Sequence, residues 1–317
     1  MKFFLAILLA FGCTAAQAQG YPTRPVKIVV AFSPGGGTDI VARVLGQKLG
    51  EMWGQQVIVE NRAGASGTIG TEYAARSAPD GYTLFMGTLG NLSVNKHLYP
   101  KMTVDPIRDF APITKVVDVF FVLVAHPSVP AKNVQELIDL AKSKPGGVTY
   151  GSSGPGGAPH LAAELFKRMA GVDMTHVPYK ASAQSFQDLL GGQVMITMDS
   201  QIQALPYIRD GRLRALGVLS SQRSAQLPEV PTIAETVPGY ELTNWFGLVA
   251  PAATPKDLLA KISADVQKAL QDPGLREKIT ALSAAVVGDS PEQFGATMRA
   301  DSEKWARVIR EANIKAE

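Results

Sequence analysis

Cysteine is almost absent from this sequence, and the one cysteine among 317 residues is Cys13. It lies in an N-terminal segment where Lys2 precedes an apolar run over residues 3–11 and the small-x-small pattern Ala16-Gln17-Ala18. Such a segment is typical of a secretory signal peptide, so we predict that residues 1–18 are removed by cleavage near Ala18 and that the protein is exported. The mature chain would then contain no thiol, which excludes disulfides, cysteine catalysis and thiolate metal sites.

The sequence also lacks long apolar runs and a strong charge of either sign. After the predicted signal peptide, no segment offers the ~18 uninterrupted apolar residues that a membrane-spanning helix needs. A lipid anchor on Cys13 is the alternative to cleavage near Ala18, but it requires a small residue at the position of Phe11. The formal net charge is +3 and no lysine or arginine cluster is present, which argues against nucleic-acid and membrane binding.

What the sequence does contain is glycine-rich passages directly after apolar runs. The run over residues 26–31 leads into Phe32-Ser33-Pro34-Gly35-Gly36-Gly37-Thr38-Asp39, and apolar residues then recur at helical spacing. This pattern predicts a strand, a glycine loop and the start of a helix. The loop can hold an anion, because glycine lets the backbone approach a ligand and the first N–H groups of a helix have no partner within it. We expect a bulky residue at Gly36 to abolish binding without unfolding the protein.

The same pattern recurs along the chain and predicts an α/β fold. Strands are expected at residues 57–60, 82–86, 148–150, 175–179, 194–198 and 213–219, and a second prominent glycine loop at residues 151–160. We expect residues 87–91 to form a loop after the third strand. In an open α/β sheet, ligands collect beyond the carboxyl ends of the strands, so these loops should share one rim.

An internal repeat divides the chain. The pattern Phe-x-Leu-Val-Ala-x-x-x-x-Pro occurs at residues 121–130 and again at 246–255. A globular composition and a length suited to two domains agree with a chain that leaves one lobe, builds a second and returns. We therefore predict one lobe from residues 20–122 plus 247–317 and a second from 123–246; chance recurrence of an apolar pentapeptide is the alternative. Thr254 and Ser290 are predicted to cap the helices that follow them.

A series of motifs in fixed order resembles the Bug family, the extracytoplasmic solute receptors of tripartite tricarboxylate transporters. The motifs are Ser33-Pro34-Gly35-Gly36-Gly37-Thr38-Asp39, Asn61-Arg62-x-Gly64-x-x-Gly67, Tyr150-Gly151-Ser152-Ser153-Gly154, His160-Leu161-Ala162-x-Glu164-Leu165-Phe166, His176-Val177-Pro178-Tyr179-Lys180, Leu189-Leu190-Gly191-Gly192-Gln193, Leu227-Pro228-x-Val230-Pro231-Thr232 and Trp245-x-Gly247-Leu248. The similarity covers essentially the whole mature chain. It implies a type II periplasmic-binding-protein fold, with two Rossmann-like lobes joined by two hinge crossings.

The resemblance also implies a function and a set of binding residues. The protein would be a periplasmic receptor, a monomer without cofactor or metal, that closes on a small organic carboxylate and delivers it to membrane subunits of the transporter. In the family, backbone N–H groups and water hold a ligand carboxylate between two loops. Carried over, the first-lobe residues are Phe32, Ser33, Gly35, Gly36, Thr38 and Asp39, and the second-lobe residues are Ser152, Ser153, Gly154 and Gly157. Further candidates are Ser66, Thr88, Asn91, His160, Tyr179, Ala183 and Asp199.

Several roles stay open at this point. Asp199 either accepts a hydrogen bond from a ligand amine or hydroxyl, or links the domains without touching ligand. Asp39 is expected to orient a water or cap its own helix rather than meet the carboxylate. The chain departs from the family pattern at residues 89–91 and at Ala181 and Gln184, which leaves the identity of the acid open.

Two other function classes are weighed against a transport receptor. A secreted hydrolase is disfavoured, because Gly151-Ser152-Ser153-Gly154-Pro155 lacks the final glycine of a nucleophile elbow and no metal-ligand spacing involves His97 or His126. A carboxylate sensor that docks to a signalling receptor cannot be separated from a transport receptor on these residues. Trp245 adjoins the second predicted crossing and could respond to closure.

Overall fold

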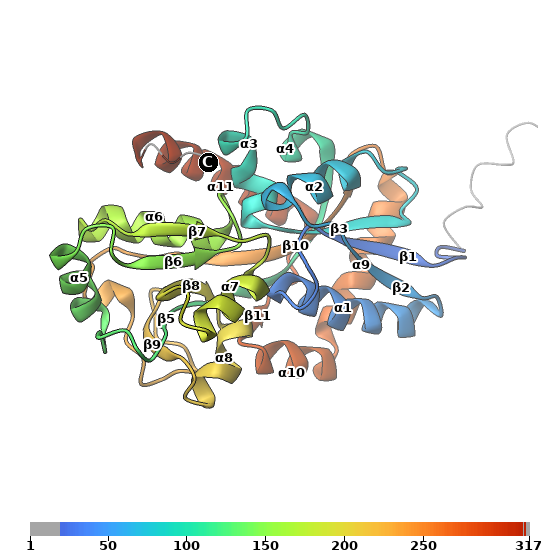
Figure 1. Cartoon of the computed structure of the whole chain (residues 1–317). Coiled ribbons are helices and arrows are strands. Elements are labelled where there is room, and N and C mark those ends of the chain that lie inside the picture. Colours follow the sequence, from blue (N-terminus) through green and yellow to red (C-terminus); the bar gives the residue numbers. More distant parts are fainter. Residues whose placement is uncertain (1–19, 313, 315–317) are drawn as a thin grey trace, which may run out of the picture.

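The computed structural model describes residues 20–312 and 314, and within them two β-sheets form two lobes (Figure 1). The strand order is β11-β4-β10-β3-β1-β2 in the six-stranded sheet of lobe 1 and β7-β6-β8-β5-β9 in the five-stranded sheet of lobe 2. Helices flank both sheets, so the predicted α/β class is confirmed. The predicted signal peptide, residues 1–18, lies outside the described residues.

Lobe 1 is built from two separate stretches of chain. Its elements are β1 (Val26–Val30), α1 (Gly37–Trp53), β2 (Val57–Asn61), η1 (Ala65–Gly67), α2 (Thr68–Ala75), β3 (Thr83–Thr88), η2 (Gly90–Val94), α3 (Asn95–Leu98), α4 (Pro106–Asp109), β4 (Phe110–Val119), β10 (Asn244–Pro251), α9 (Lys256–Gln271), α10 (Pro273–Ala281), β11 (Ala284–Val286) and α11 (Pro291–Ala312). Strands β1, β2 and β3 run parallel, so the loops after them emerge on one rim of the sheet.

Lobe 2 is continuous in sequence. Its elements are β5 (Phe121–Ala125), α5 (Val134–Ser143), β6 (Thr149–Ser152), α6 (Ala158–Ala170), β7 (Thr175–Pro178), α7 (Ser182–Leu190), β8 (Ile196–Ser200), α8 (Gln201–Arg209), β9 (Arg214–Val218) and η3 (Ile233–Glu235). Strands β6, β7 and β8 are parallel, and their carboxyl ends face the corresponding rim of lobe 1 across the pocket described below.

The internal repeat occupies equivalent places in the two lobes. Its copies form β5 and most of β10, and each runs antiparallel to both neighbouring strands of its sheet. Every residue of both strands is buried, which accounts for the apolar repeat. The chain passes from β4 to β5 at Phe120 and returns to lobe 1 in the connection that ends at Asn244. The expected boundaries at 122/123 and 246/247 therefore fall inside β5 and β10, a few residues after each crossing.

Local signals account for most helix ends. Gly54 ends α1 in the left-handed conformation that glycine favours, with φ of 62°. The Gln293 N–H donates to Ser290 Oγ at 3.2 Å and the Ser290 N–H donates to Gln293 Oε1 at 2.9 Å, so the predicted cap of α11 is confirmed. The predicted Thr254 cap is wrong, because its hydroxyl donates to the Pro251 carbonyl at 2.7 Å and α9 starts at Lys256.

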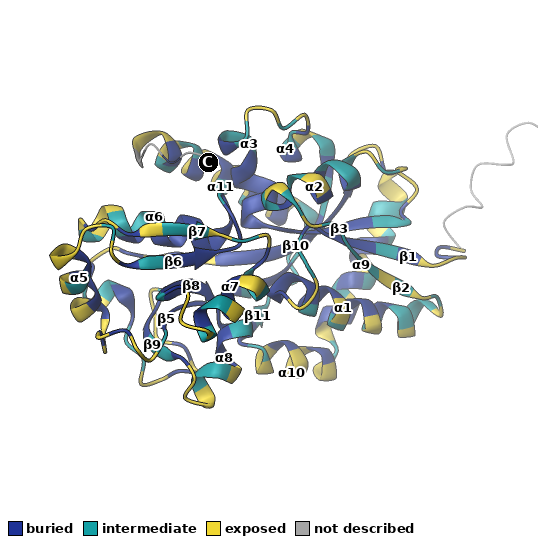
Figure 2. Ribbon diagram, viewed as in Figure 1, coloured by how far each residue is buried: buried dark blue, intermediate teal, exposed yellow. Residues whose placement is uncertain are grey.

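Apolar burial is concentrated on the sheets and on the inner faces of the helices, while exposed residues follow the outer helical faces and the loops (Figure 2). One cluster of buried apolar residues runs through lobe 1 and into lobe 2, and a smaller one fills the space between the lobe 2 sheet and helices α7 and α8. None of the helices in the described residues carries an apolar stretch long enough to cross a bilayer.

Candidate functional site

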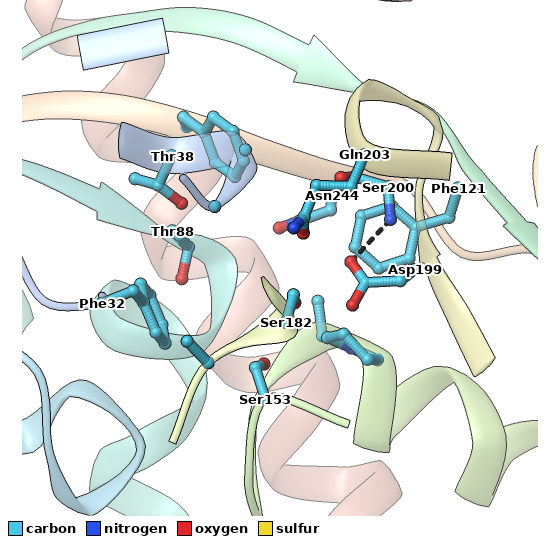
Figure 3. Close-up of a pocket in the computed structure, with 16 residues that line it drawn as sticks. Phe32, Thr38, Thr88, Phe121, Ser153, Ser182, Asp199, Ser200, Gln203 and Asn244 are labelled. Carbon is cyan, nitrogen blue, oxygen red and sulfur yellow. Dashed lines mark hydrogen bonds between the residues drawn. The ribbon is translucent and has the colours of Figure 1, made fainter. Parts of the chain in front are cut away.

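A pocket lies between the two lobes where their strand ends face each other (Figure 3). It encloses about 450 Å³ of empty space, part of which is open to solvent. Both lobes contribute to it, so no single lobe forms the site. The lining residues are Phe32, Gly36, Gly37, Thr38, Thr88, Phe121, Ser153, Ala158, Pro159, Ala181, Ser182, Asp199, Ser200, Gln203, Asn244 and Phe246.

The lobe 1 side of the pocket is the N-terminus of α1. Gly36 is the N-cap residue, with extended backbone at φ −76° and ψ 161°, and no side chain of the described residues caps the helix. Gly37 and Thr38 form the first turn and line the pocket. The N–H groups of a first turn have no acceptor within the helix, and the helix dipole adds positive potential there. This end of the pocket is therefore suited to a carboxylate.

Asp39 braces the loop before α1 instead of lining the pocket. Its carboxylate accepts hydrogen bonds from the Gly35 N–H at 2.9 Å, from Asn61 Nδ2 at 2.9 Å and from Arg43 Nε at 3.0 Å. Asn61 Nδ2 also donates to the Phe32 carbonyl at 3.0 Å, which ties the loop to β2. Burial by itself would raise the pKa of Asp39, but these hydrogen bonds and the Arg43 charge lower it below its ordinary value. Asp39 thus shapes the loop as a charged acceptor, and its hydrogen bond from the Gly35 N–H lies before the N-cap Gly36, so it does not cap α1.

The lobe 2 counterpart is the loop before α6, where Ser153, Ala158 and Pro159 line the pocket. Gly157 is the N-cap residue of α6, again without a side-chain cap among the described residues. The uncapped N-termini of α1 and α6 therefore both border the pocket, and so do those of α7 and α8, whose N-cap residues Ala181 and Ser200 line it.

Ser152 and His160 hold this loop in shape from behind. Ser152 Oγ accepts from the Gly154 N–H at 3.0 Å and lies 2.6 Å from His176 Nε2, and His160 Nδ1 accepts from the Gly156 N–H at 3.1 Å. The two histidine rings stack with centroids 4.5 Å apart. Burial lowers the pKa of His160 to about 4 and that of His176 to about 3, so both are neutral at pH 7.

The Ser152–His176 pair does not form a catalytic dyad. Ser152 is completely buried and does not line the pocket, and its oxygen is already engaged by a backbone N–H. Among the described residues, no group accepts or donates at His176 Nδ1, so nothing orients the ring as a base. The described residues also contain no group of three or more His, Cys, Asp or Glu that could hold a metal ion.

Asp199 lies at the end of β8, on the far side of the pocket from α1, and is 3% exposed. Its Oδ1 accepts from the Ser200 N–H at 2.6 Å, whereas its Oδ2 has no hydrogen-bond partner among the described residues. Burial raises the pKa of Asp199 to about 6, although the Ser182 hydroxyl and the Ser200 N–H partly oppose that shift. An unpaired oxygen on a buried carboxylate facing a pocket is typical of a ligand contact rather than of a domain link.

The structure brings six predicted binding residues to the pocket lining. They are Phe32, Gly36, Thr38, Thr88, Ser153 and Asp199. Thr88 donates through Oγ1 to Asn91 Oδ1 at 2.9 Å, and Asn91 lies just behind the lining. The expected loop at residues 87–91 is wrong, because β3 extends through Thr88 and Gly90 begins a π-helical turn whose residues are all buried.

The other predicted residues lie beside the pocket. Ser66 and Gly154 meet each other across the lobes, since a Cβ on Gly154 would come within 2.6 Å of Ser66 Oγ. Tyr179 turns its hydroxyl to Asp188 at 2.7 Å, and Ala183 follows the lining residue Ser182 in the first turn of α7. Ser33, Gly35, Asp39, Asn91, Ser152, Gly157 and His160 likewise are not lining residues.

Sequence reasoning missed ten lining residues, namely Gly37, Phe121, Ala158, Pro159, Ala181, Ser182, Ser200, Gln203, Asn244 and Phe246. Two of these carried a signal, because Phe121 and Phe246 are the first residues of the two repeat copies. Ser200 and Gln203 directly follow Asp199, where β8 runs into α8. Gly37, Ala158 and Pro159 lie within the two predicted glycine loops, and Ala181 was noted as a departure from the family pattern, whereas Ser182 and Asn244 carried no signal.

Known proteins with similar sequences include a family of transport receptors. The model of the "Tripartite tricarboxylate transporter family receptor" matches residues 41–314. Protein BugT of Bordetella pertussis is 37% identical over 322 residues, which cover 99% of this chain and 99% of BugT.

Solved structures match over almost their whole length. The R. palustris protein Rpa4515, solved with adipate, has a TM-score of 0.90 and 37% identity and covers 93% of this chain and 99% of its own. The periplasmic binding protein BugD has a TM-score of 0.90 and 35% identity, covering 94% of this chain and 100% of its own. MatC (Rpa3494) from Rhodopseudomonas palustris, with bound malate, has a TM-score of 0.87 and 32% identity, covering 91% of this chain and 100% of its own.

Proposed function

Because the chain belongs to the receptor family of tripartite tricarboxylate transporters, we propose that it captures a small organic carboxylate between its lobes and delivers it to the membrane subunits of such a transporter. The family assignment made from the sequence motifs is confirmed, and the family is one of solute receptors rather than enzymes. Its relatives include periplasmic binding proteins.

The observation that carries the proposal is the pair of uncapped helix N-termini on opposite sides of one pocket. The first turn of α1 and the start of α6 supply backbone N–H groups, and Thr38 and Ser153 add hydroxyls. These groups can satisfy a carboxylate without a buried cation. Two relatives that cover nearly the whole chain were solved with adipate and with malate, which supports the same ligand class.

The location and assembly of the protein belong to the same proposal. We expect cleavage near Ala18, release into the periplasm, and a monomer that docks to the transporter. A carboxylate sensor that docks to a signalling receptor would use the same pocket. Carboxylate uptake in a deletion strain separates the two, since unchanged uptake with loss of a signalling response would favour the sensor.

The direct test is isothermal titration calorimetry of the mature protein against a panel of mono-, di- and aromatic carboxylates at pH 7. At least one member should bind, and binding should raise the melting temperature because the ligand binds only the folded state. Replacing Thr38 with valine, which keeps the shape and removes the hydroxyl, should weaken that binding. A panel without a single binder would overturn the proposal.

A further inference from the structure

One side of the pocket, formed where β8 runs into α8 and where β10 starts, is lined by buried acceptor oxygens. Asp199 Oδ2, Asn244 Oδ1 and Gln203 Oε1 are buried and have no hydrogen-bond partner among the described residues. All three side chains line the pocket, and they lie across it from Thr38 and Thr88 (Figure 3). Because buried polar atoms are almost always paired in folded proteins, three orphan oxygens at one end of a pocket point to a ligand that donates hydrogen bonds there.

The three side chains differ in whether they can only accept a hydrogen bond or can also donate one. An amide offers either an oxygen or an NH₂ group, although the Gln203 Nε2 donates to the Gly35 carbonyl at 3.4 Å, which leaves Oε1 as its free atom. An ionised carboxylate can only accept. Asp199 is therefore the residue that sets the chemistry of this end.

The charges of the pocket lining restrict which chemical groups the ligand can place next to Asp199. No lysine, arginine or histidine occurs among the described residues that line the pocket, and Asp199 is the only ionisable side chain there. A buried carboxylate without a counter-charge is costly, and its raised pKa expresses that cost. A second ligand carboxylate on this side would place a negative charge next to that of Asp199. A cationic nitrogen would instead supply the positive charge that Asp199 lacks.

We propose that the ligand carries a cationic nitrogen in addition to its carboxylate, and that Asp199, assisted by Gln203 and Asn244, binds this nitrogen. The inference rests on the proposed function, because the carboxylate end is assigned to α1 and α6. Phe121 and Phe246 contribute aromatic rings to the lining, which suit the apolar body of the ligand and a nearby cation. In keeping with the small organic carboxylate of the proposed function, the ligand class is a small zwitterionic acid.

The test compares ligands that differ in a single substituent, which lies at the carbon opposite the carboxylate in the first series and at the carbon next to one carboxylate in the second. One series is γ-aminobutyrate, butyrate and glutarate, and another is aspartate, malate and succinate, each titrated by calorimetry at pH 7. In at least one series the amine should bind about tenfold or more tightly than both of its counterparts, since a hydrogen bond to a charged group is stronger than a neutral one. This comparison uses the unmodified protein and does not depend on the folding of any variant.

The variant Asp199→Asn tests the residue. Asparagine can still accept from the Ser200 N–H, so the end of β8 is retained, but the charge is removed. The preference for the amine over the plain acid should fall by about tenfold or more. Asp289→Asn is the matched control, because Asp289 is also a partly buried carboxylate with a raised pKa but does not line the pocket. That variant should keep the preference.

Three outcomes of these titrations would contradict the inference, in whole or in part. Equal or tighter binding of the dicarboxylates, or proton uptake when they bind, would overturn the zwitterion inference and leave the carboxylate receptor standing. An amine preference that survives in Asp199→Asn would remove Asp199 from the site. Absence of binding by every acid in both series, and in the wider panel, would overturn the proposed function together with the inference.

Discussion

Two buried carboxylates in this protein show how a single residue can serve the scaffold or the ligand. Asp39 is surrounded by donors from Gly35, Arg43 and Asn61, and its pKa is lowered despite its burial. Asp199 accepts a hydrogen bond from the Ser200 N–H and has the Ser182 hydroxyl nearby, yet burial still raises its pKa to about 6. The first carboxylate stabilises the folded protein as an anion, and the second destabilises it until something binds.

The raised pKa of Asp199 predicts how the stability of the ligand-free protein depends on pH. Because the pKa of Asp199 is raised on folding, the folded state keeps a proton that the unfolded state loses, and stability falls as the pH rises from about 4 to about 6. Asp199→Asn lacks this penalty. Without ligand at pH 7, its free energy of unfolding should exceed that of the unmodified protein by about 2–3 kcal/mol, and the gap should close near pH 4.

Urea denaturation at both pH values measures this, with Asp289→Asn as the control for loss of a carboxylate elsewhere in the chain. A variant no more stable than the unmodified protein at pH 7 would mean that Asp199 has a partner in solution. A gain in stability combined with a loss of amine binding would mark Asp199 as a residue kept for function at the expense of stability.

At the scale of elements, the N-terminus of α1 is where the lobes come closest to the ligand. A Cβ on Gly37 would lie 3.2 Å from Ser200 Oγ and 3.5 Å from Ile202 Cδ1, both in lobe 2, and 3.6 Å from Phe246 Cζ. A Cβ on Gly36 would meet only the Ser33 carbonyl, at 3.7 Å. An added Cβ would therefore meet lobe 2 at Gly37 but not at Gly36.

We predict that Gly37→Ala weakens ligand binding by about fivefold or more, because the methyl group must push the lobes or the Ser200 side chain apart. Gly36→Ala should change affinity by less than about twofold, since its backbone conformation suits any residue and the space is open. Calorimetry with a ligand from the panel measures both. Similar losses in the two variants would show that the backbone itself, rather than the approach of lobe 2, limits this site.

The same elements show what the sequence could predict and what it could not. Apolar runs followed by glycines predicted β1, α1, β6 and α6, because burial and backbone freedom leave a direct mark on sequence. The π-helical turn from Gly90 was predicted as a loop, since its glycine and asparagine are typical of turns and nothing local shows that Leu92 and Val94 are buried. Secondary structure was thus predictable where the residues of a single strand or helix carry the signal, and not where burial depends on the rest of the fold.

The pocket was predictable only in part, because it depends on how two lobes meet. The loop from Gly154 to Gly157 was assigned to ligand binding, yet Gly156 packs against α3 of lobe 1, where a Cβ would lie 2.8 Å from Asn95 Oδ1 and from Leu98 Cδ1. Conversely, Asn244 lies far in sequence from the two predicted binding loops and enters the pocket through the return of the chain to lobe 1. Contacts between lobes leave no periodic pattern in either segment.

For the whole molecule, the two lobes contact each other around the pocket. Tyr99 of lobe 1 donates its hydroxyl to the Pro155 carbonyl of lobe 2 at 2.5 Å, and Gln203 of lobe 2 donates to the Gly35 carbonyl of lobe 1 at 3.4 Å. Near the crossings, Ser283 Oγ donates to Gln201 Oε1 at 3.1 Å. Opening the lobes would break the first two contacts and expose the pocket, so these contacts stabilise the state that retains ligand.

Tyr99→Phe tests closure without touching the pocket, because Tyr99 does not line it. Loss of one hydrogen bond between the lobes, of about 0.5–1.5 kcal/mol, should raise the ligand dissociation rate by about two- to tenfold and leave the association rate nearly unchanged. Small-angle X-ray scattering should show a larger radius of gyration at subsaturating ligand. Tyr179→Phe is the matched control, since it removes a hydroxyl that bonds Asp188 within lobe 2. If Tyr179→Phe speeds dissociation as much as Tyr99→Phe does, Tyr179 contacts ligand as the motif suggested, and the Tyr99 effect cannot be assigned to closure.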